Sequence, residues 1–429
     1  MTQVFYRSPA HSYPQISHGQ GIYLFDQNGK RYLDGSSGAL VANLGHGRRE
    51  IAQAMAEQAE RVAFAHTARF TSAAQEELAA RIAAMLPYGL AHTYPVSGGS
   101  EATETAIKLA RQYHLEHGDP GRFRILARWA SYHGNSLGAL AASGHIARRC
   151  PYLPLLSPAF AHFDPPREEC PGPTSARECP CLASLRATME QVDPFSVAAI
   201  LLEPVGGSAS SGLVPHRGYI AGVRTIADEF GVLLIADEVM TGFGRTGEIL
   251  GMSHFSTAPD MITCAKGISG GYAPLGAVVA NDRVYGAVAG GSGRFAHGFT
   301  YGGHPVSCAA GAKALALLEE EDLVANAARM GSLLRDGLEA LRLRHGFIQA
   351  VRGLGLMQGL VLEPGPEPGA RASRLADQAF DRGLIVYPGS GGPEGVEGDH
   401  VLVAPPLIID SPGVDELLSL LDESIADPN

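Results

Sequence analysis

Two residues that could do chemistry stand at the ends of apolar runs in the middle of the chain. Lys266 follows the run Met261–Ala265, and Asp237 follows the run Val232–Ala236. A lysine removed from water loses part of its preference for the charged form, so its amine can attack an aldehyde and form a Schiff base. A carboxylate at the end of a buried strand needs a cationic partner. A lysine that reaches the surface and an aspartate that caps a turn are the plainer interpretations.

A third feature is the stretch Val96–Arg111, in which Gly99 and Ser100 open an Ala-rich segment with helical spacing. The free N–H groups and the dipole of such a helix start favour an anion such as a phosphate. The Gly-Lys-Ser/Thr of a Walker loop is absent, and an ordinary helix cap is the alternative. A lysine for an aldehyde, a carboxylate for a ring nitrogen and a helix start for a phosphate together predict a site for pyridoxal 5′-phosphate (PLP).

The composition is that of an enzyme-sized globular chain with an acidic balance. Its 429 residues carry 33 Lys and Arg against 44 Asp and Glu, a formal net charge of −11. Without a basic block, binding to nucleic acid or to an anionic membrane is not expected. The apolar runs are far shorter than the roughly 18 to 20 residues that span a bilayer. The start of the chain lacks the charged-then-apolar order of a signal peptide, so we expect a cytoplasmic protein.

The cysteines offer one candidate metal site, which the spacing disfavours. Cys170, Cys179 and Cys181 lie close together, with His162 upstream. Paired C-x2-C ligands are missing and the segment is rich in proline, so we expect an exposed insertion with free thiols and no metal.

The hydrophobic pattern predicts an α/β fold with a mostly parallel sheet. Residues 21–34 alternate around Asn-Gly as in a hairpin, and residues 49–61 and 73–85 have helical spacing. Strands that are apolar on both faces belong in a sheet covered by helices. The expected strands of this sheet are 125–128, 197–202, 232–236, 261–265 and 276–280.

We expect three parts along the chain. Residues 1–60 form an N-terminal segment that joins a small domain, 61–310 a large cofactor-binding domain, and 311–429 a C-terminal small α+β domain. The tail supports this division, with a helix-rich stretch from 305 to 344, short apolar runs and an amphipathic helix over 415–425.

The sequence resembles the class III aminotransferases, the ω-aminotransferase group of the fold-type I PLP enzymes, over nearly its whole length. The motifs that carry the resemblance are Asp34-Gly35 with Leu44-Gly45-His46, Gly99-Ser100-Glu101-Ala102, Ser131-Tyr132-His133-Gly134, Leu202-Glu203-Pro204, the run 237–247, Lys266-Gly267 and Phe299-Thr300-Tyr301-Gly302-Gly303-His304-Pro305. The resemblance implies a large, mostly parallel sheet domain covered by helices, with a smaller α+β domain built from both chain ends.

The resemblance also implies how the cofactor is held. Gly99 and Ser100 would bind its phosphate, and Tyr132 would stack on its pyridine ring. Asp237 would pair with the ring nitrogen, while Val239 would pack on the opposite face of the ring.

Four further residues complete the expected site. Lys266 would form the Schiff base, and Thr300 would reach the phosphate of the neighbouring subunit's cofactor, which makes a homodimer the minimum active unit. His133 would sit beside the stacked tyrosine, and Glu203 would organise the pocket. A satisfied structural histidine and a structural glutamate before a proline are the alternatives for these last two.

The expected reaction is transamination between a primary amine or ω-amino acid and a keto acid, in a ping-pong cycle. The arginine with which relatives usually bind a carboxylate is not identifiable, because Asn135 follows the Tyr-His-Gly motif and Gly395-Val396-Glu397 precede Gly398-Asp399-His400. Arg149 and Arg294 are weak substitutes. We therefore expect pyruvate as the acceptor, since it carries one carboxylate only.

Two other functions use the same features. A PLP-dependent decarboxylase, racemase or aminomutase would need the same cofactor site, because one fold supports many reactions. A non-catalytic scaffold would not need Lys266, Asp237 and Tyr132 together, so it is disfavoured.

Overall fold

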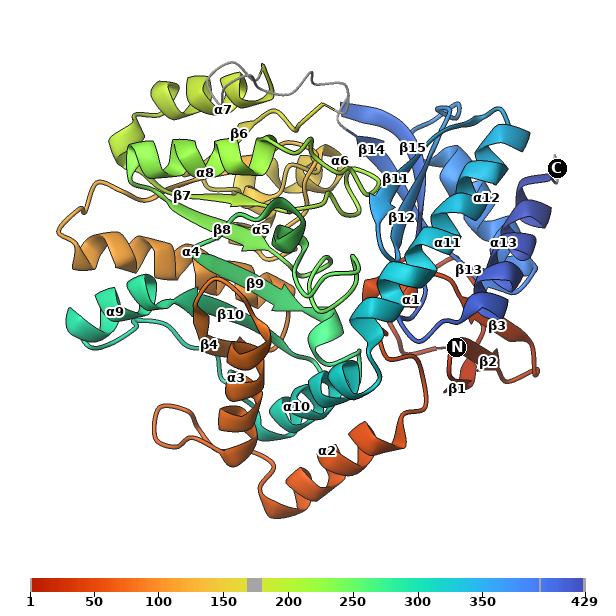
Figure 1. The fold of residues 1–429 in the computed structure, drawn as a ribbon, viewed down its shortest axis with the longest axis horizontal. Coiled ribbons are helices and arrows are strands. Elements are labelled where there is room, and N and C mark those ends of the chain that lie inside the picture. The colour runs from red at the N-terminus through yellow and green to blue at the C-terminus, as the bar shows by residue number, and fades with distance from the viewer. Residues whose placement is uncertain (1, 168–179, 393–394, 427–429) are drawn as a thin grey trace.

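A seven-stranded mixed sheet forms the centre of the molecule (Figure 1). The computed structural model describes residues 2–167, 180–392 and 395–426. The sheet order is β4-β10-β9-β8-β7-β5-β6. These strands span Leu90–Val96 (β4), Gly276–Asn281 (β10), Met261–Ala265 (β9), Leu233–Asp237 (β8), Val197–Leu202 (β7), Arg124–Arg128 (β5) and Phe160–Phe163 (β6).

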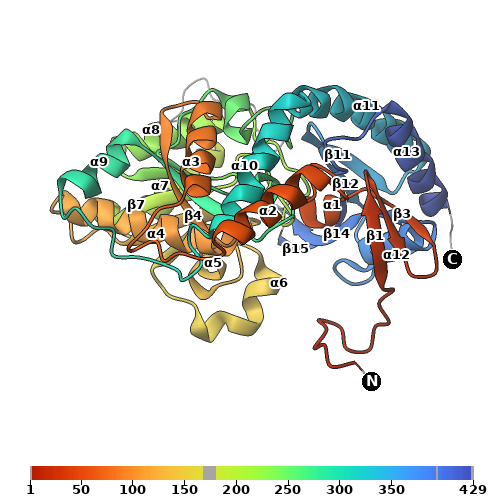
Figure 2. The ribbon, with the colours of Figure 1, turned by 90° about the horizontal axis from the view of Figure 1, so that it is seen from below.

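Neighbouring strands from β9 to β6 run parallel, and only β10 pairs antiparallel with both of its neighbours. All residues of β7, β8 and β9 are buried. Helix α4 (Gly99–Glu116) lies on one face of the sheet, and α7 (Pro180–Gln191) and α8 (Tyr219–Phe230) lie on the other (Figure 2). The expected α/β fold is therefore confirmed, and the parallel strands all end at one edge of the sheet.

Two smaller sheets flank the large one. The first has the order β1-β2-β3-β13, and its β1 spans Ile16–Gln20. Strands β2 (Tyr23–Asp26) and β3 (Arg31–Asp34) form the expected hairpin. Strand β13 (Leu384–Ile385) joins β3 in parallel, so segments from both chain ends share a sheet. The boundaries at residues 60 and 310 remain a proposal.

The second small sheet has the order β11-β12-β15-β14. Its strands span Ile348–Leu354 (β11), Met357–Leu362 (β12), Gly395–Val403 (β15) and Tyr387–Gly392 (β14). Helices α11 (Leu323–Arg344) and α12 (Ala370–Asp381) pack against this sheet at the right of Figure 1, and α13 (Ser411–Ala426) packs against α11, α12 and β13.

Three of the remaining helices pack together, and one of them contacts β4 of the large sheet. Helices α2 (Arg49–Arg61) and α3 (Ala73–Met85) have the predicted bounds, and α10 (Pro305–Glu320) packs against both. Ser72 caps α3 through its side chain. The shorter helices are α1 (Ser37–Leu40), α5 (Leu137–Ala142), α6 (Ile146–Arg149) and α9 (Asp282–Gly290).

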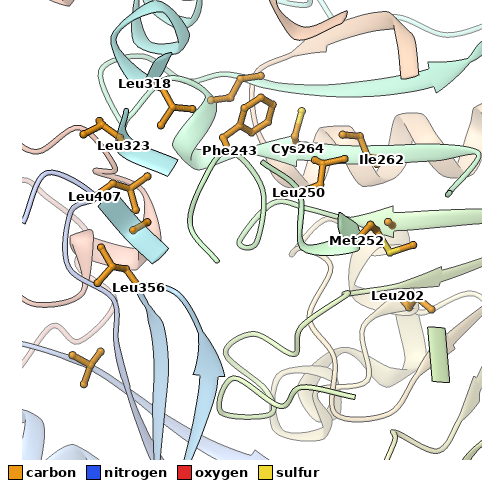
Figure 3. Close-up of a cluster of buried hydrophobic side chains, with 14 of the residues drawn as sticks. Leu202, Phe243, Leu250, Met252, Ile262, Cys264, Leu318, Leu323, Leu356 and Leu407 are labelled. Atoms are coloured by element: carbon orange, nitrogen blue, oxygen red, sulfur yellow. The ribbon is translucent and has the colours of Figure 1, made fainter. Parts of the chain in front are cut away.

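One continuous core joins the large sheet to the C-terminal part. In Figure 3, Ile262 and Cys264 of β9 lie near Phe243, while Leu318, Leu356 and Leu407 lie on the side of the C-terminal elements. All are almost fully buried. Because a close-packed core deforms little, the loop that follows β8 is held rigidly between the two parts.

Part of the cysteine prediction is wrong. Cys170 and Cys179 lie outside the described residues, but Cys181 is buried, because it lies in the first turn of α7 and packs in the core. Cys150 is exposed, and Cys264 and Cys308 are buried free thiols. Within the described ranges, no cluster of three or more His, Cys, Asp and Glu has a metal-binding arrangement. Nor does any helix in those ranges have the length and apolar character of a membrane span.

Candidate active site

A cavity of about 200 Å³ lies at the carboxyl edge of the parallel strands. Eight of the nine residues expected at the site line it, and Thr300 does not. The lining residues are Gly99, Ser100, Tyr132, His133, Gly134, Glu203, Val205, Asp237, Val239, Met240, Thr241 and Lys266. Ligands of open α/β sheets bind at this edge, so the fold brings distant segments together where chemistry is expected.

Lys266 enters the cavity directly from the end of β9. Its backbone adopts a left-handed conformation, with φ of 51°, at the start of a single 3-10 turn. Burial lowers the pKa of its amine to about 8, while the carboxylates of Asp237 and Glu203 act in the opposite direction. A sizeable fraction of the amine is therefore neutral near pH 8, as a nucleophile requires.

Asp237 faces Lys266 from the end of β8 and is held by two hydrogen bonds. Its Oδ2 lies 2.7 Å from Nδ1 of His133, and its Oδ1 accepts a bond of 3.1 Å from the amide of Val239. The side chain is only 4% exposed. A buried carboxylate with fixed orientation can stabilise a positive charge on a group that enters the cavity.

His133 is anchored through its backbone as well as its ring. Its N–H donates to the hydroxyl of Ser143, and its carbonyl accepts from the hydroxyl of Thr103. Among the described residues, its Nε2 has no hydrogen-bond partner although it is buried. This histidine therefore orients Asp237 and also presents an unpaired ring nitrogen.

Glu203 follows β7 and is nearly fully buried. Its Oε1 accepts a hydrogen bond of 3.1 Å from the amide of Gly207, while its Oε2 has no partner among the described residues. Burial raises the pKa of this carboxyl, and the charge of Asp237 raises it further. The protonated form is thus favoured by the fold.

We expect Glu203→Gln to stabilise the protein more at pH 8 than at pH 5.5. A carboxyl whose pKa is raised by folding loses its stabilising contribution as the pH rises above the unfolded value, and Gln removes this dependence. Scanning calorimetry should show a gain in Tm of about 1 to 2 °C at pH 8 and less at pH 5.5. Glu190→Gln, at an exposed position of α7, is the control. Equal shifts at both pH values for Glu203→Gln would contradict the expectation.

The start of helix α4 borders the cavity and can accept an anion. Its N-cap residue, Gly98, supplies no capping side chain. A Cβ at Gly99 would lie 3.1 Å from Val239, and one at Gly134, where φ is 132°, would lie 2.6 Å from the Ser100 hydroxyl. The backbone therefore approaches closely because these positions are glycine, which leaves the N–H groups of the first turn near the cavity.

Two arginines near the site were missed by the sequence reasoning. Arg148, on α6, places its Cζ 4.5 Å from the centroid of the Tyr132 ring. Arg245 is buried and donates hydrogen bonds to Asn43 and Pro405, so it ties the loop after β8 to segments from both chain ends. Arg245 lies in the quoted 237–247 run, but nothing in the sequence indicated that it would be buried.

The arginines suggested as weak substitutes do not line the cavity. Nη1 of Arg149 donates to the backbone carbonyls of Leu140, Ala141 and Ser143, so it anchors the α5–α6 connection. Arg294 is exposed on the loop before α10.

Comparison with known proteins identifies the family. The family model for class-III aminotransferases matches residues 6–425 of the chain. The uncharacterized aminotransferase YodT of Bacillus subtilis is 36% identical over 97% of this chain and 95% of its own length.

Two solved structures are similar over almost the whole chain. The (S)-enantioselective ω-transaminase from Thermomicrobium roseum is 36% identical, with a TM-score of 0.89 over 99% of this chain and 97% of that one. An amine transaminase from an uncultivated Pseudomonas species, solved in its PLP-bound form, is 34% identical, with a TM-score of 0.90 over 99% and 98%. The fold is that of the fold-type I PLP transaminases, and the chain belongs to the class III aminotransferases.

Proposed function

We propose that this enzyme moves an amino group from a primary amine or ω-amino acid to pyruvate, in a ping-pong cycle that uses PLP. The observation that carries the proposal is the meeting of Lys266, whose pKa is lowered by burial, with the Asp237–His133 pair in one cavity. The family supplies the general reaction, and the cavity supplies groups suited to it.

The donor set of the cavity fits PLP. The glycine-lined start of α4 suits a phosphate, and Asp237 suits a protonated ring nitrogen. Tyr132 and Val239 line the cavity and offer flat and apolar surfaces for the two faces of a ring. Gly99, Ser100, Tyr132, His133, Glu203, Asp237, Val239 and Lys266 would therefore hold the cofactor. When bound, PLP supplies an aldehyde that takes up the amino group and an electron-withdrawing ring.

The chain's own groups would bind, orient and move protons. Lys266 would hold the aldehyde of the cofactor, and its amine, when free and neutral, would accept the proton that leaves the donor carbon. Asp237 keeps the ring nitrogen protonated, with His133 holding the carboxylate in place. Glu203, whose pKa is raised by burial, lines the same cavity as Asp237.

We further propose a homodimer in which Thr300 contributes to the partner's site. Thr300 lies on the loop between α9 and α10 and is exposed in the single chain, beside the exposed ring of Tyr301. Exposed aromatic side chains are frequent in subunit interfaces. Sedimentation of the wild type and of Thr300→Ala, each with PLP titrated in, tests both the assembly and the contact.

With one shared amine donor, kcat/KM should be higher for pyruvate than for 2-oxoglutarate. The second carboxylate of 2-oxoglutarate must leave water, and an unpaired charge is costly to bury. A panel of amine donors with each acceptor, followed by amino-acid analysis, measures both the reaction and the preference. We expect alanine to form without release of carbon dioxide. Carbon dioxide release or racemisation without alanine would instead indicate another PLP reaction, and a preference for 2-oxoglutarate would contradict the acceptor assignment.

A further inference from the structure

Arg148 does not itself line the cavity, but unlike Arg149 and Arg294 it stacks on a residue that does, and its guanidinium lacks a carboxylate partner among the described residues. Its Cζ stacks over Tyr132, whose ring lines the cavity, and its Nη2 lies 3.5 Å from the hydroxyl of Tyr387 on β14. Within the described part of the chain, no Asp or Glu lies within ion-pair distance of this guanidinium. Arg148 is half-buried, so its guanidinium is neither sealed in the core nor neutralised by a described carboxylate, and it can pair with the carboxylate of a ligand.

The positive charge at this place belongs to Arg148 rather than to the neighbouring histidines. Burial lowers the pKa of His145 to about 4, and the charge of Arg148 lowers it further. Burial also lowers the pKa of His400. Both histidines are therefore neutral at physiological pH, and the charge of Arg148 reaches the cavity, where it contributes to lowering the pKa of Lys266.

The two adjacent arginines of α6 have different surroundings. Arg149 is bound by three backbone carbonyls and holds the short helix in place. Arg148 is thereby presented from an anchored segment, next to a tyrosine hydroxyl that accepts from it and keeps its own proton to donate. An arginine edge and a tyrosine hydroxyl side by side form a donor pair suited to one carboxylate.

We propose that Arg148, assisted by the hydroxyl of Tyr387, binds the carboxylate of the keto-acid acceptor and, in the other half-reaction, that of an ω-amino acid donor. This inference rests on the proposed function and names the carboxylate-binding residue for it. Arg148 takes the role for which the sequence offered no residue, since Asn135 and Gly395-Val396-Glu397 stand where relatives have arginines. One arginine can pair with one carboxylate, which agrees with pyruvate rather than 2-oxoglutarate as the preferred acceptor.

Direct binding of a carboxylate that cannot react gives the first test. Butanoate and its uncharged analogue butanamide are titrated by calorimetry into PLP-loaded wild type, Arg148→Gln and Arg148→Lys. We expect Arg148→Gln to weaken butanoate binding about 10- to 100-fold, as for a lost charge-assisted hydrogen bond, and to leave butanamide unchanged. Arg148→Lys keeps the positive charge but cannot form the two parallel hydrogen bonds of a guanidinium, so its loss of butanoate affinity should be smaller than that of Arg148→Gln.

The matched control is Arg124→Gln. Arg124 also stacks on an aromatic ring, that of Phe123, and donates to a backbone carbonyl, but it lies at the amino end of β5, away from the cavity. We expect butanoate binding to this variant to equal that to the wild type.

A single half-reaction without acceptor provides the kinetic test. The rate at which bound PLP takes up the amino group is compared for 4-aminobutanoate and butan-1-amine, which differ by the carboxylate. Arg148→Gln should raise the apparent KM for 4-aminobutanoate about 10- to 100-fold and leave that for butan-1-amine unchanged. Tyr387→Phe should act in the same direction with a smaller effect.

The outcomes separate this inference from the proposed function. Butanoate binding that is equal in wild type and Arg148→Gln, or absent from both, overturns the role of Arg148 even if amines are converted. Loss of butanoate binding in Arg148→Gln supports it even if no tested amine is a donor, in which case the proposed function fails alone. Equal losses for butan-1-amine and 4-aminobutanoate would show that the substitution damages the site as a whole and would also overturn the inference.

Discussion

Lys266→Ala should lower transamination by a factor of about 10⁴ or more while the protein stays folded. The expected loss is large because one amine has two tasks, covalent binding of the aldehyde and movement of the proton from the donor carbon. Among the described residues that line the cavity, no other side chain carries an amine. Turnover is measured as alanine formed from pyruvate, and folding as the Tm of the cofactor-free protein, which should change little because the side chain faces a cavity.

The composition makes the assignment of the covalent lysine unusually clear. The chain has four lysines, at positions 30, 108, 266 and 313. Borohydride reduction followed by peptide mapping should therefore place the cofactor on Lys266, and Lys313→Ala, on the half-exposed side of α10, should leave turnover unchanged. Cofactor found on another lysine, or retained turnover in Lys266→Ala, would show that the site is wrongly assigned.

The architecture around these residues followed from the sequence to a large extent. Strand β7 is apolar at every position, β8 and β9 each carry one polar residue in an otherwise apolar run, and helices α2 and α3 have clear helical spacing, so local pattern and final fold agree. Strand β6 was not predicted, because its residues Phe160–Phe163 alternate only weakly and follow a proline-rich turn. The antiparallel direction of β10 was also beyond a local pattern, since direction depends on chain path rather than on residue type.

The residues of the cavity that lie at strand ends could be predicted from the sequence. The residues that reach the cavity only through tertiary contacts could not. Lys266 and Asp237 end buried strands, so their positions follow from the strands themselves. The stacking of Arg148 on Tyr132 joins residues from the α5–α6 region whose path the sequence leaves open. Nor could the sequence distinguish Arg148 from Arg149, because only the fold shows that one is bound by carbonyls and the other is not.

Asp237→Asn should give a folded protein whose kcat is lower by about 10²- to 10³-fold. Asn has nearly the same shape and can still accept from the amide of Val239, so the backbone geometry should persist. It carries no negative charge, however, and the ring nitrogen of bound PLP would lose the group that favours its protonation. The loss should therefore appear in kcat for every donor, whether or not the donor carries a carboxylate, in contrast to the effect expected at Arg148.

A neighbouring buried carboxylate allows this charge effect to be separated from burial. Glu238 lies one position later but faces away from the cavity, where its carboxylate accepts from the amides of Gly251 and Met252. Burial raises its pKa to about 7. Glu238→Gln should change stability through these hydrogen bonds and leave kcat per folded enzyme near the wild-type value. The pH dependence of the absorption of bound PLP should shift in Asp237→Asn and stay unchanged in Glu238→Gln, because only Asp237 would contact the ring nitrogen. Near wild-type kcat in Asp237→Asn, or the same spectral shift in both variants, would remove the role assigned to Asp237.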